Sequence, residues 1–379
     1  TASVIVSADD SRIQYMGRFD QANPKRPRFD WPGTRITFRF TGPKASVRLS
    51  GGRNDFNVFV DGEARPRLSL VDGKSEYEVA SGLGPGEHTV VISKRTEAYY
   101  GIASFEGVVL EDGHGLATPP ERPTRRLLFI GDSYTVGYGN EATSLDCSDL
   151  RPFDDNWQAW GPVAARSLGA EYHVTAVSGL GMVHNYADTK PLSDEPFPAL
   201  FDRTLAGSDA PTWDFTAWTP HAVAVALGTN DFSTAVKPTE DQYVSAYKTF
   251  VGRLRSHFPF AEIVLVVYSG DTYQERYVET LVKDLNTAGD AKVRRFTMPT
   301  MGSDLGCHYH PNVAAHRRFA DAVSPLLSSL FPPTGLVGRP NSARPGAAKA
   351  SGASPTPLFP RVRNGKADWL DANGRPPGR

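Results

Sequence analysis

The chain has 379 residues, enough for two or three domains of ordinary size. Its 41 basic and 42 acidic residues give a net charge of −1, and 40% of the residues are hydrophobic. This composition excludes a wholly disordered chain and a strongly basic nucleic-acid-binding protein. We therefore expect no nucleic-acid partner. No apolar run approaches the ~20 residues of a membrane span, so we expect no membrane-spanning segment either.

Residues 1–118 alternate apolar and polar side chains in short runs separated by Gly, Pro and Asp. Runs with this period of two predict an antiparallel β-sandwich or jelly roll. The expected strands lie at 36–40, 45–49, 56–60, 88–92 and 105–110. Three aromatic residues, Trp31, Tyr99 and Tyr100, are candidates for stacking on a sugar, but packing in a core or interface is the commoner role. We therefore favour a structural role for this domain.

The pattern changes after the Pro-rich segment 119–126, which we interpret as a stiff linker. Uninterrupted apolar runs are typical of buried parallel strands, and here they alternate with helical segments. The runs lie at 127–130, 174–177, 222–227, 263–267 and 293–296, and the helices at 157–168, 240–257, 273–288 and 312–330. This alternation predicts a three-layer, flavodoxin-like α/β domain over residues 127–331.

Residues 332–379 form a third compositional region. They contain nine prolines and carry a net charge of +6, which leaves −7 for residues 1–331. The segment has no long apolar run, and we expect a flexible tail.

Three polar or small residues follow three successive expected strands: Ser133, Gly179 and Asn230. The carboxyl ends of parallel strands meet at one edge of the sheet, where catalytic groups gather. A serine at the start of a helix is often only a cap, and each signal is weak by itself. Together they supply a nucleophile and three oxyanion donors: the N–H groups of Ser133 and Gly179 and the amide of Asn230.

A base is provided by His310, which precedes the proline at the start of the last helix. An imidazole can take the proton of Ser133 and return it to the leaving group. A zinc site formed by His308, His310 and His316 is an alternative. We rank it lower because the sequence has no His-Glu-x-x-His motif and no Cys pair at metal-binding spacing.

Four motifs of this chain resemble, in order and spacing, the four sequence blocks of SGNH/GDSL hydrolases. They are Gly131-Asp132-Ser133, Gly179, Gly228-Thr229-Asn230-Asp231 and His310. Residues 1–331 as a whole resemble carbohydrate esterase family two, whose members have a jelly roll followed by an SGNH domain. Further support comes from Trp31-Pro32-Gly33, Lys94-Arg95-Thr96-Glu97 and Ser178-Gly179-Leu180-Gly181.

The resemblance implies an esterase that removes acetyl groups from plant polysaccharides such as xylan and glucomannan, or from their oligosaccharides, often at the primary 6-hydroxyl. An esterase of this kind is expected to need no metal or organic cofactor. We assign Asp132, Gly181 and Tyr309 to substrate binding, and Tyr309 stands where the family often has Trp. Two other functions stay open: a carbohydrate-binding protein with a weakened site, and an SGNH lipase or thioesterase.

The chain departs from the SGNH pattern at one position. The usual Asp two residues before the catalytic His is replaced by His308. An imidazole cannot stabilise the imidazolium of His310 as a carboxylate does. A backbone carbonyl could orient His310, Asp304 could do so from six residues upstream, or the activity could be weakened. We favour the carbonyl, with Asp304 second.

Cys147 and Cys307 are the two cysteines of the chain. They form either a disulfide or two buried thiols, and we favour the disulfide because each lies beside a catalytic motif. The sequence begins with Thr1, and we expect a secreted monomer whose signal peptide has been removed.

Overall fold

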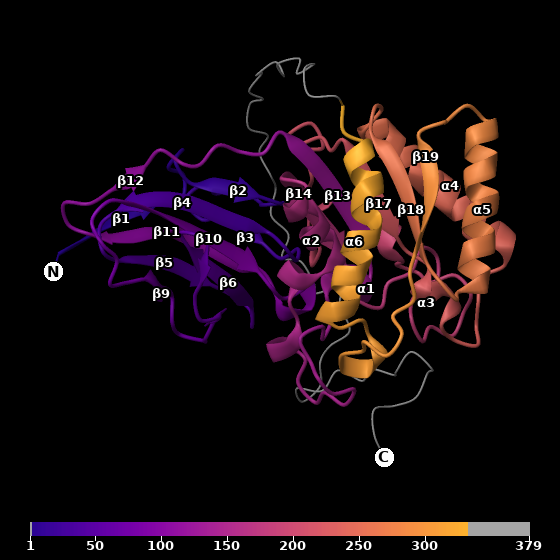
Figure 1. Cartoon of the computed structure of the whole chain (residues 1–379), viewed down its shortest axis with the longest axis horizontal. Coiled ribbons are helices and arrows are strands. Elements are labelled where there is room, and N and C mark those ends of the chain that lie inside the picture. The colour runs from indigo at the N-terminus through magenta and orange to yellow at the C-terminus, as the bar shows by residue number, and fades with distance from the viewer. Residues whose placement is uncertain (1, 333–379) are drawn as a thin grey trace.

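The computed structural model describes residues 2–332 and shows two regions side by side (Figure 1). An all-β region holds the N-terminal part of the chain, and an α/β region follows it. The expected tail lies outside the described residues except for Pro332. No helix within residues 2–332 is long and apolar enough to cross a membrane.

The β region consists of two antiparallel sheets. The first runs in the order β1-β11-β5-β9, with β3 paired to β11, and the second in the order β12-β4-β10-β6-β7, with β2 on β4 and β8 on β6. The strands of the first sheet are β1 (Ser3–Ser7), β3 (Arg28–Phe29), β5 (Ala45–Ser50), β9 (Glu76–Ala80) and β11 (Ala103–Glu111). Those of the second are β2 (Gln14–Met16), β4 (Arg35–Thr41), β6 (Asp55–Val60), β7 (Glu63–Ala64), β8 (Leu68–Ser69), β10 (Glu87–Lys94) and β12 (Leu116–Ala117).

The period-two pattern explains how the two sheets share one core. In β4 the side chains of Ile36, Phe38 and Phe40 are buried, while the residues between them are partly exposed. They pack in one cluster with side chains of the other sheet, such as Val47 and Phe105. The five strands expected in this region are all present, each extended by one to three residues.

The α/β region is built on a five-stranded parallel sheet in the order β14-β13-β17-β18-β19. This order, second strand first, is that of flavodoxin-like sheets, whose ligands bind at the switch point between the first and third strands. The strands are β13 (Arg125–Gly131), β14 (Ala170–Ala176), β17 (Ala222–Ala226), β18 (Glu262–Tyr268) and β19 (Val293–Met298). The predicted parallel sheet is confirmed.

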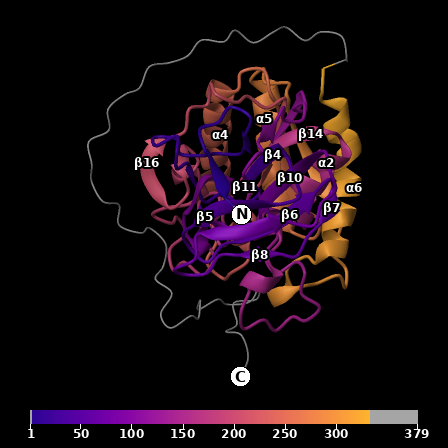
Figure 2. The same cartoon turned by 90° about the vertical axis from the view of Figure 1, so that its left-hand side faces the viewer.

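Helices cover both faces of this sheet (Figures 1 and 2). In β17, Val223 and Val225 pack in the core with α4 (Glu240–His257) and α5 (Thr272–Thr287). The alternate residue Ala224 packs with α2 (Trp160–Ser167) and α6 (Val313–Ser329). Because both faces are covered, these strands are apolar throughout, which is why they read as uninterrupted runs.

Short elements escaped the sequence analysis because two to five residues carry no usable periodicity. One is an antiparallel hairpin of β15 (Arg203–Leu205) and β16 (Ser208–Thr212). The helices α1 (Ser133–Val136) and α3 (Thr229–Phe232) are further examples, as are the 3-10 turns η1 (Ala98–Tyr100), η2 (Arg151–Phe153), η3 (Asn156–Gln158), η4 (Phe197–Ala199) and η5 (Cys307–Tyr309). The seven other strands of the β region, β1, β2, β3, β7, β8, β9 and β12, were missed for the same reason.

The three aromatic residues of the β region that were candidates for sugar stacking lie at the interface with the α/β region and contact it. Trp31 is fully buried in the core of the α/β region, and its Nε1 donates to the carbonyl of Thr204 at 3.0 Å. Tyr99 donates its hydroxyl to the carbonyl of Ser178 at 2.8 Å. The side chain of Tyr100 bonds Asp154. The burial of Trp31 rules out a stacking role for it.

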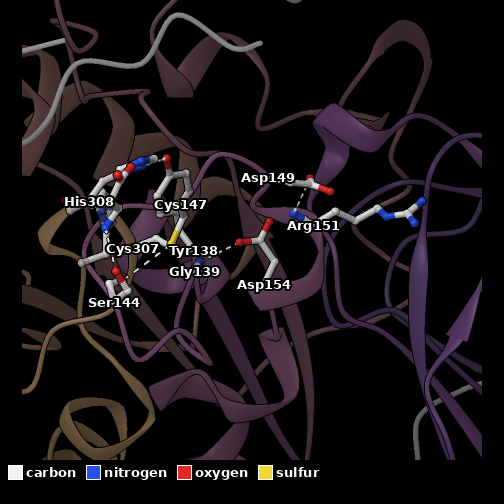
Figure 3. Close-up of a disulfide and its surroundings, with 11 residues drawn as sticks. Tyr138, Gly139, Ser144, Cys147, Asp149, Arg151, Asp154, Cys307 and His308 are labelled. Carbon is white, nitrogen blue, oxygen red and sulfur yellow. Dashed lines mark hydrogen bonds between the residues drawn. A yellow bond between two sulfur atoms is a disulfide. The ribbon is translucent and has the colours of Figure 1, made fainter. Parts of the chain in front are cut away.

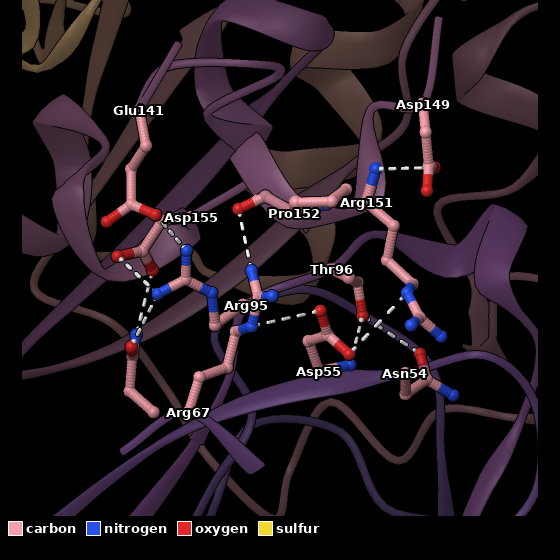
Figure 4. Close-up of polar contacts among 11 residues, drawn as sticks. Asn54, Asp55, Arg67, Arg95, Thr96, Glu141, Asp149, Arg151, Pro152 and Asp155 are labelled. Atoms are coloured by element: carbon pink, nitrogen blue, oxygen red, sulfur yellow. Dashed lines mark hydrogen bonds and ion pairs between the residues drawn. The ribbon is translucent and has the colours of Figure 1, made fainter. Parts of the chain in front are cut away.

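Polar contacts across the interface centre on Arg95 (Figure 4). Its Nη1 donates to Asn57 at 2.8 Å and to Asp155 of the α/β region at 3.2 Å, and its Nη2 bonds Glu141. Asn57 in turn donates to Asp155 at 2.8 Å. In segment 119–126, Arg122 forms an ion pair with Glu171 at 2.9 Å, and the last two residues already belong to β13, so the linker is shorter than predicted.

Candidate active site

Ser133 is the first residue of α1 and directly follows β13. Asp132 caps this helix, since its Oδ1 accepts the N–H of Tyr134 at 3.0 Å. The first N–H groups of a helix have no acceptor within the helix, so that of Ser133 is available to a ligand. The carboxyl end of β13 thus presents a hydroxyl and a backbone donor from the same residue.

His310 lies against this serine. Its Nε2 is 2.9 Å from the Oγ of Ser133, and its Nδ1 is 3.0 Å from the backbone carbonyl of His308. A carbonyl only accepts, so Nδ1 carries the proton and Nε2 is left as the basic nitrogen. Asp304 pairs instead with Arg318. The sequence left open which group orients His310. In the structure a backbone carbonyl accepts its Nδ1 proton, and Asp304 does not bond the imidazole.

The carbonyl of His308 is aimed at the imidazole by an unusual backbone. His308 and Tyr309 have φ values of 51° and 63°, in the left-handed region. Such a conformation costs about 1–3 kcal/mol for a non-glycine residue and persists only where its surroundings enforce it.

The surroundings of His308 are shown in Figure 3. The expected disulfide between Cys147 and Cys307 is present, directly before His308. The N–H of His308 donates to the carbonyl of Leu145 at 2.8 Å, and Tyr138 Oη lies 2.8 Å from its Nδ1. The His loop, residues 304–312, is therefore held by cross-links to the segment 138–147.

The three histidines considered for zinc have separate partners. The ring of His308 meets Tyr138, that of His310 meets Ser133, and His316 Nδ1 accepts the N–H of Trp160 at 3.2 Å. Within residues 2–332 no group of three His, Cys, Asp or Glu side chains could hold a metal ion.

Gly179 follows β14 with a φ of +80° and is only half-buried. An L side chain rarely adopts this conformation, which explains the glycine. Asn230, the second residue of α3, donates its amide to the carbonyl of Leu180 at 2.9 Å and to Asp132 Oδ2 at 3.3 Å. Both amide hydrogens of Asn230 are thus directed to protein acceptors, one of them through a long bond.

Two residues assigned to substrate binding support the site from within. Asp132 is fully buried, and its two oxygens cap α1 and accept from Asn230. Gly181 is buried, its N–H donates to Asn185 at 3.1 Å, and its carbonyl accepts from Phe197 at 2.9 Å. The polar groups of both residues bond to other parts of the protein, and substrate binding by either residue stays a prediction.

The third substrate candidate, Tyr309, is 41% exposed and adjacent to His310.

Two residues of the site were not predicted from the sequence. The ring of Tyr138 packs against that of His310, with ring centres 4.2 Å apart and an angle of 38° between the ring planes. Asp231 is fully buried and accepts the N–H groups of Met182, Val183 and His184 at 2.8–2.9 Å. Only its place beside Asn230 in the third motif signalled it.

Burial shifts the pKa values of the site in different directions. Desolvation lowers the pKa of His310 to about 4, and the neighbouring His308 ring adds to this effect. Desolvation raises the pKa of Asp132 to about 7, and the Asp231 carboxylate adds to that shift. Because its pKa is lowered, the imidazole of His310 is neutral at pH 7, the state that a general base requires.

A serine and a neutral histidine at the switch point of a parallel sheet, beside backbone donors, define a serine hydrolase of the α/β class. The family model described as GDSL-like Lipase/Acylhydrolase family matches residues 129–318, and the one described as Carbohydrate esterase 2 N-terminal matches residues 15–120.

Two curated relatives are similar to this chain over most of its length. The chain is 32% identical over 298 residues to an acetylxylan esterase/glucomannan deacetylase of Cellvibrio japonicus, which covers 75% of this chain and 80% of that protein. It is 35% identical over 327 residues to the cellulase/esterase CelE of Acetivibrio thermocellus, covering 83% of this chain. The match spans about two fifths (39%) of the length of CelE.

A solved structure of a family two carbohydrate esterase from Clostridium thermocellum, in complex with cellohexaose, is 33% identical to this chain. It superposes with a TM-score of 0.79 and covers 84% of this chain and 98% of that one. The chain belongs to the family two carbohydrate esterases.

Proposed function

We propose that the protein removes O-acetyl groups from acetylated plant polysaccharides, xylan or glucomannan, or from their oligosaccharides, through an acetyl-enzyme on Ser133. The observation that carries this proposal is the hydrogen bond of 2.9 Å between Ser133 Oγ and His310 Nε2, with Nδ1 bound to the His308 carbonyl. The Cellvibrio japonicus relative, an acetylxylan esterase/glucomannan deacetylase, supports the substrate class.

In the first half-reaction His310 takes the proton of Ser133 as Oγ bonds to the acetyl carbon. The negative charge that develops on the carbonyl oxygen is stabilised by the N–H groups of Ser133 and Gly179. Asn230 joins them by redirecting its longer bond, the 3.3 Å contact with Asp132. The bond from the acetyl carbon to the sugar oxygen then breaks, and that oxygen receives the proton from His310.

The second half-reaction repeats these roles with water. His310 takes a proton from the water molecule, whose oxygen bonds to the acetyl carbon of the acetyl-enzyme. Ser133 leaves and regains its proton, and acetate is released. During both steps the carbonyl of His308 keeps the imidazole oriented, without the charge that a carboxylate would contribute.

The sugar side of the substrate lies, in this proposal, against Tyr309. Its ring is 41% exposed and belongs to the residue directly before the base. An aromatic face next to the reacting atoms offers apolar area to a sugar ring while its hydroxyl stays wet. Tyr309→Ala is expected to raise KM for acetylated oligosaccharides while leaving KM for 4-nitrophenyl acetate within about twofold.

Acetate release from acetylated xylan, from acetylated glucomannan and from 6-O-acetyl glucose tests the proposal directly. Wild-type protein is expected to release acetate from at least one of them, and Ser133→Ala is expected to release none. Full activity in Ser133→Ala would overturn the mechanism. A clear preference for 4-nitrophenyl octanoate over the acetate would favour a lipase or thioesterase instead.

Non-catalytic binding of glucan chains is the second candidate, favoured by the cellohexaose complex of the Clostridium thermocellum relative and by the missing carboxylate at position 308. Retention of Ser133→Ala in affinity gels that contain the polysaccharide would support it if wild-type turnover were negligible.

We also propose that the protein is secreted and acts as a monomer. Disulfides such as Cys147–Cys307 persist in oxidising compartments, and the paired Ser133 and His310 come from one chain. Recovery of the protein only from cell extract, with reduced cysteines, would contradict secretion, and sedimentation as a dimer would contradict the monomer.

A further inference from the structure

The loop that follows β14 is held by two buried carboxylates from different regions of the molecule. One is Asp231, which binds the far part of the loop through three N–H groups. The other is Glu97, which belongs to the β region and follows β10. Between them lies Gly179, the proposed oxyanion donor.

Glu97 binds the residue directly before that donor. Its Oε2 accepts the N–H of Ser178 at 2.9 Å, and its Oε1 accepts the hydroxyl of Ser178 at 2.7 Å. Glu97 is 3% exposed and Ser178 is 1% exposed. Water does not compete at such a site, and hydrogen bonds to a carboxylate are stronger than those between neutral groups.

Tyr99 completes this grip on Ser178, since its hydroxyl donates to the Ser178 carbonyl at 2.8 Å. That carbonyl and the N–H of Gly179 belong to one planar, trans peptide unit, so they point in opposite directions in one plane. A bond that fixes the direction of the carbonyl therefore also fixes the direction of the Gly179 N–H.

The turn that carries Glu97 is itself anchored. The ammonium group of Lys94 is fully buried and donates to the backbone carbonyls of Thr96 and Glu97, the latter at 3.1 Å. Every polar group of Ser178 is thus bound by the β region, and the part of that region which binds it has little freedom to move.

We propose that Glu97 and Tyr99 are positioning residues for the oxyanion, so that the β region completes the catalytic site of the α/β region. The inference rests on the proposed function, because it takes Gly179 as an oxyanion donor. Neither residue touches the substrate. They act through the peptide between Ser178 and Gly179, and their loss misdirects a donor whose interaction counts only in the transition state.

Three variants of the full chain test this inference with 4-nitrophenyl acetate: Tyr99→Phe, Glu97→Ala and Glu97→Gln. Removal of one oxyanion donor costs ~10²–10³ in kcat, which sets the upper limit for a misdirected donor. Tyr99→Phe is expected to lower kcat by about 10-fold and Glu97→Ala by about 100-fold, with KM within about twofold. Glu97→Gln keeps an acceptor for the Ser178 N–H and is expected to recover part of the loss.

Asp30→Asn is the matched control. Asp30 is also a buried carboxylate of the β region that accepts two backbone N–H groups of the α/β region, those of Ala206 and Gly207, at 2.9 and 2.8 Å. That turn carries no proposed donor, so this variant is expected to lower the melting temperature without changing kcat by more than about twofold.

A second readout is the affinity for a boronic acid that forms a tetrahedral adduct with Ser133. Its loss is expected to follow the loss of kcat in the Glu97 and Tyr99 variants, with Asp30→Asn unchanged. If Glu97→Ala does not fold, Tyr99→Phe alone carries the test, since it removes a single oxygen atom. A wild-type kcat in a folded Tyr99→Phe, or an equal loss in Asp30→Asn, would overturn the inference. An active Ser133→Ala would overturn the proposed function instead.

Discussion

The two partners of the proposed catalytic pair are held in place by different means. Ser133 stands at the end of β13, a central strand bonded on both sides to parallel neighbours, and its helix is capped by the adjacent Asp132. His310 lies on an irregular loop with two left-handed residues, tied to segment 138–147 by a disulfide. The nucleophile is thus positioned by local sequence and regular structure, and the base by cross-links between distant segments.

The difference teaches where this site is vulnerable. The strand end cannot move without disrupting the sheet, whereas the His loop depends on a few specific contacts. Changes in the loop are therefore expected to alter the chemistry while the fold survives. Four predictions test this comparison, beginning with the largest effect.

Removal of the base is expected to have the largest effect. His310→Ala is expected to lower kcat by ~10⁶, the loss seen when the histidine of a serine hydrolase is removed. The melting temperature should change little, because the half-buried ring is held mainly by the serine and one carbonyl. Stopped-flow or long-term measurement of 4-nitrophenol release, together with a thermal melt, checks this. A loss below about 10-fold would show that another group serves as the base.

Loss of the disulfide is expected to have the next largest effect. The double variant Cys147→Ser, Cys307→Ser removes a link between residues 160 positions apart, and such links contribute about 2–5 kcal/mol to stability. We expect kcat to fall about 10-fold or more, because the His308 carbonyl is no longer held toward His310.

Reductant added to wild-type protein should reproduce this loss, whereas the double variant should not respond to it. Labelling of Ser133 by a reactive phosphonate, followed by mass spectrometry, reports whether the strand-end half of the site is intact. An unchanged kcat after verified reduction would show that the loop keeps its shape without the link.

The pH dependence of kcat/KM tests the protonation state of the base, His310. Burial lowers the pKa of His310 to about 4, and catalysis needs the neutral ring. The part of kcat/KM that depends on His310 should therefore persist through pH 6 and be lost as the pH drops through about 4. Desolvation raises the pKa of Glu97 to about 7, so we expect a separate, partial fall of kcat/KM as the pH drops through about 7, and we expect Glu97→Gln to lack it. Complete loss of activity by pH 6 in both proteins would contradict a depressed His310 pKa.

Asp304→Ala is expected to have the smallest effect, a change in kcat of less than about threefold. Asp304 pairs with Arg318 at a partly exposed site, and such pairs contribute at most about 1 kcal/mol. Arg318→Ala is the control, because it removes the same pair from the other side. A loss of ~10⁴ in Asp304→Ala, the cost of neutralising a triad acid, would show that Asp304 orients His310 during turnover.

Much of the fold was predictable because its signals are periodic. Ile36, Phe38 and Phe40 alternate with polar residues, which is typical of a strand with one buried face. The uninterrupted apolar run Leu127–Ile130 is typical of a strand with both faces buried. The hairpin at residues 203–212 was not predictable, because its turn is held by the carboxylate of Asp30, more than 170 positions away in the chain.

The site divides along the same line. By itself the sequence determined the two kinds of sheet, the end of the first parallel strand at Ser133, and the histidine that precedes the last helix. Tertiary structure alone decided the acceptor for His310 and the inward direction of Asp132. It also brought Glu97 to Ser178. The physical reason is that burial leaves a periodic trace in local sequence, whereas a backbone carbonyl exists in every residue and a contact across 81 positions leaves no local trace.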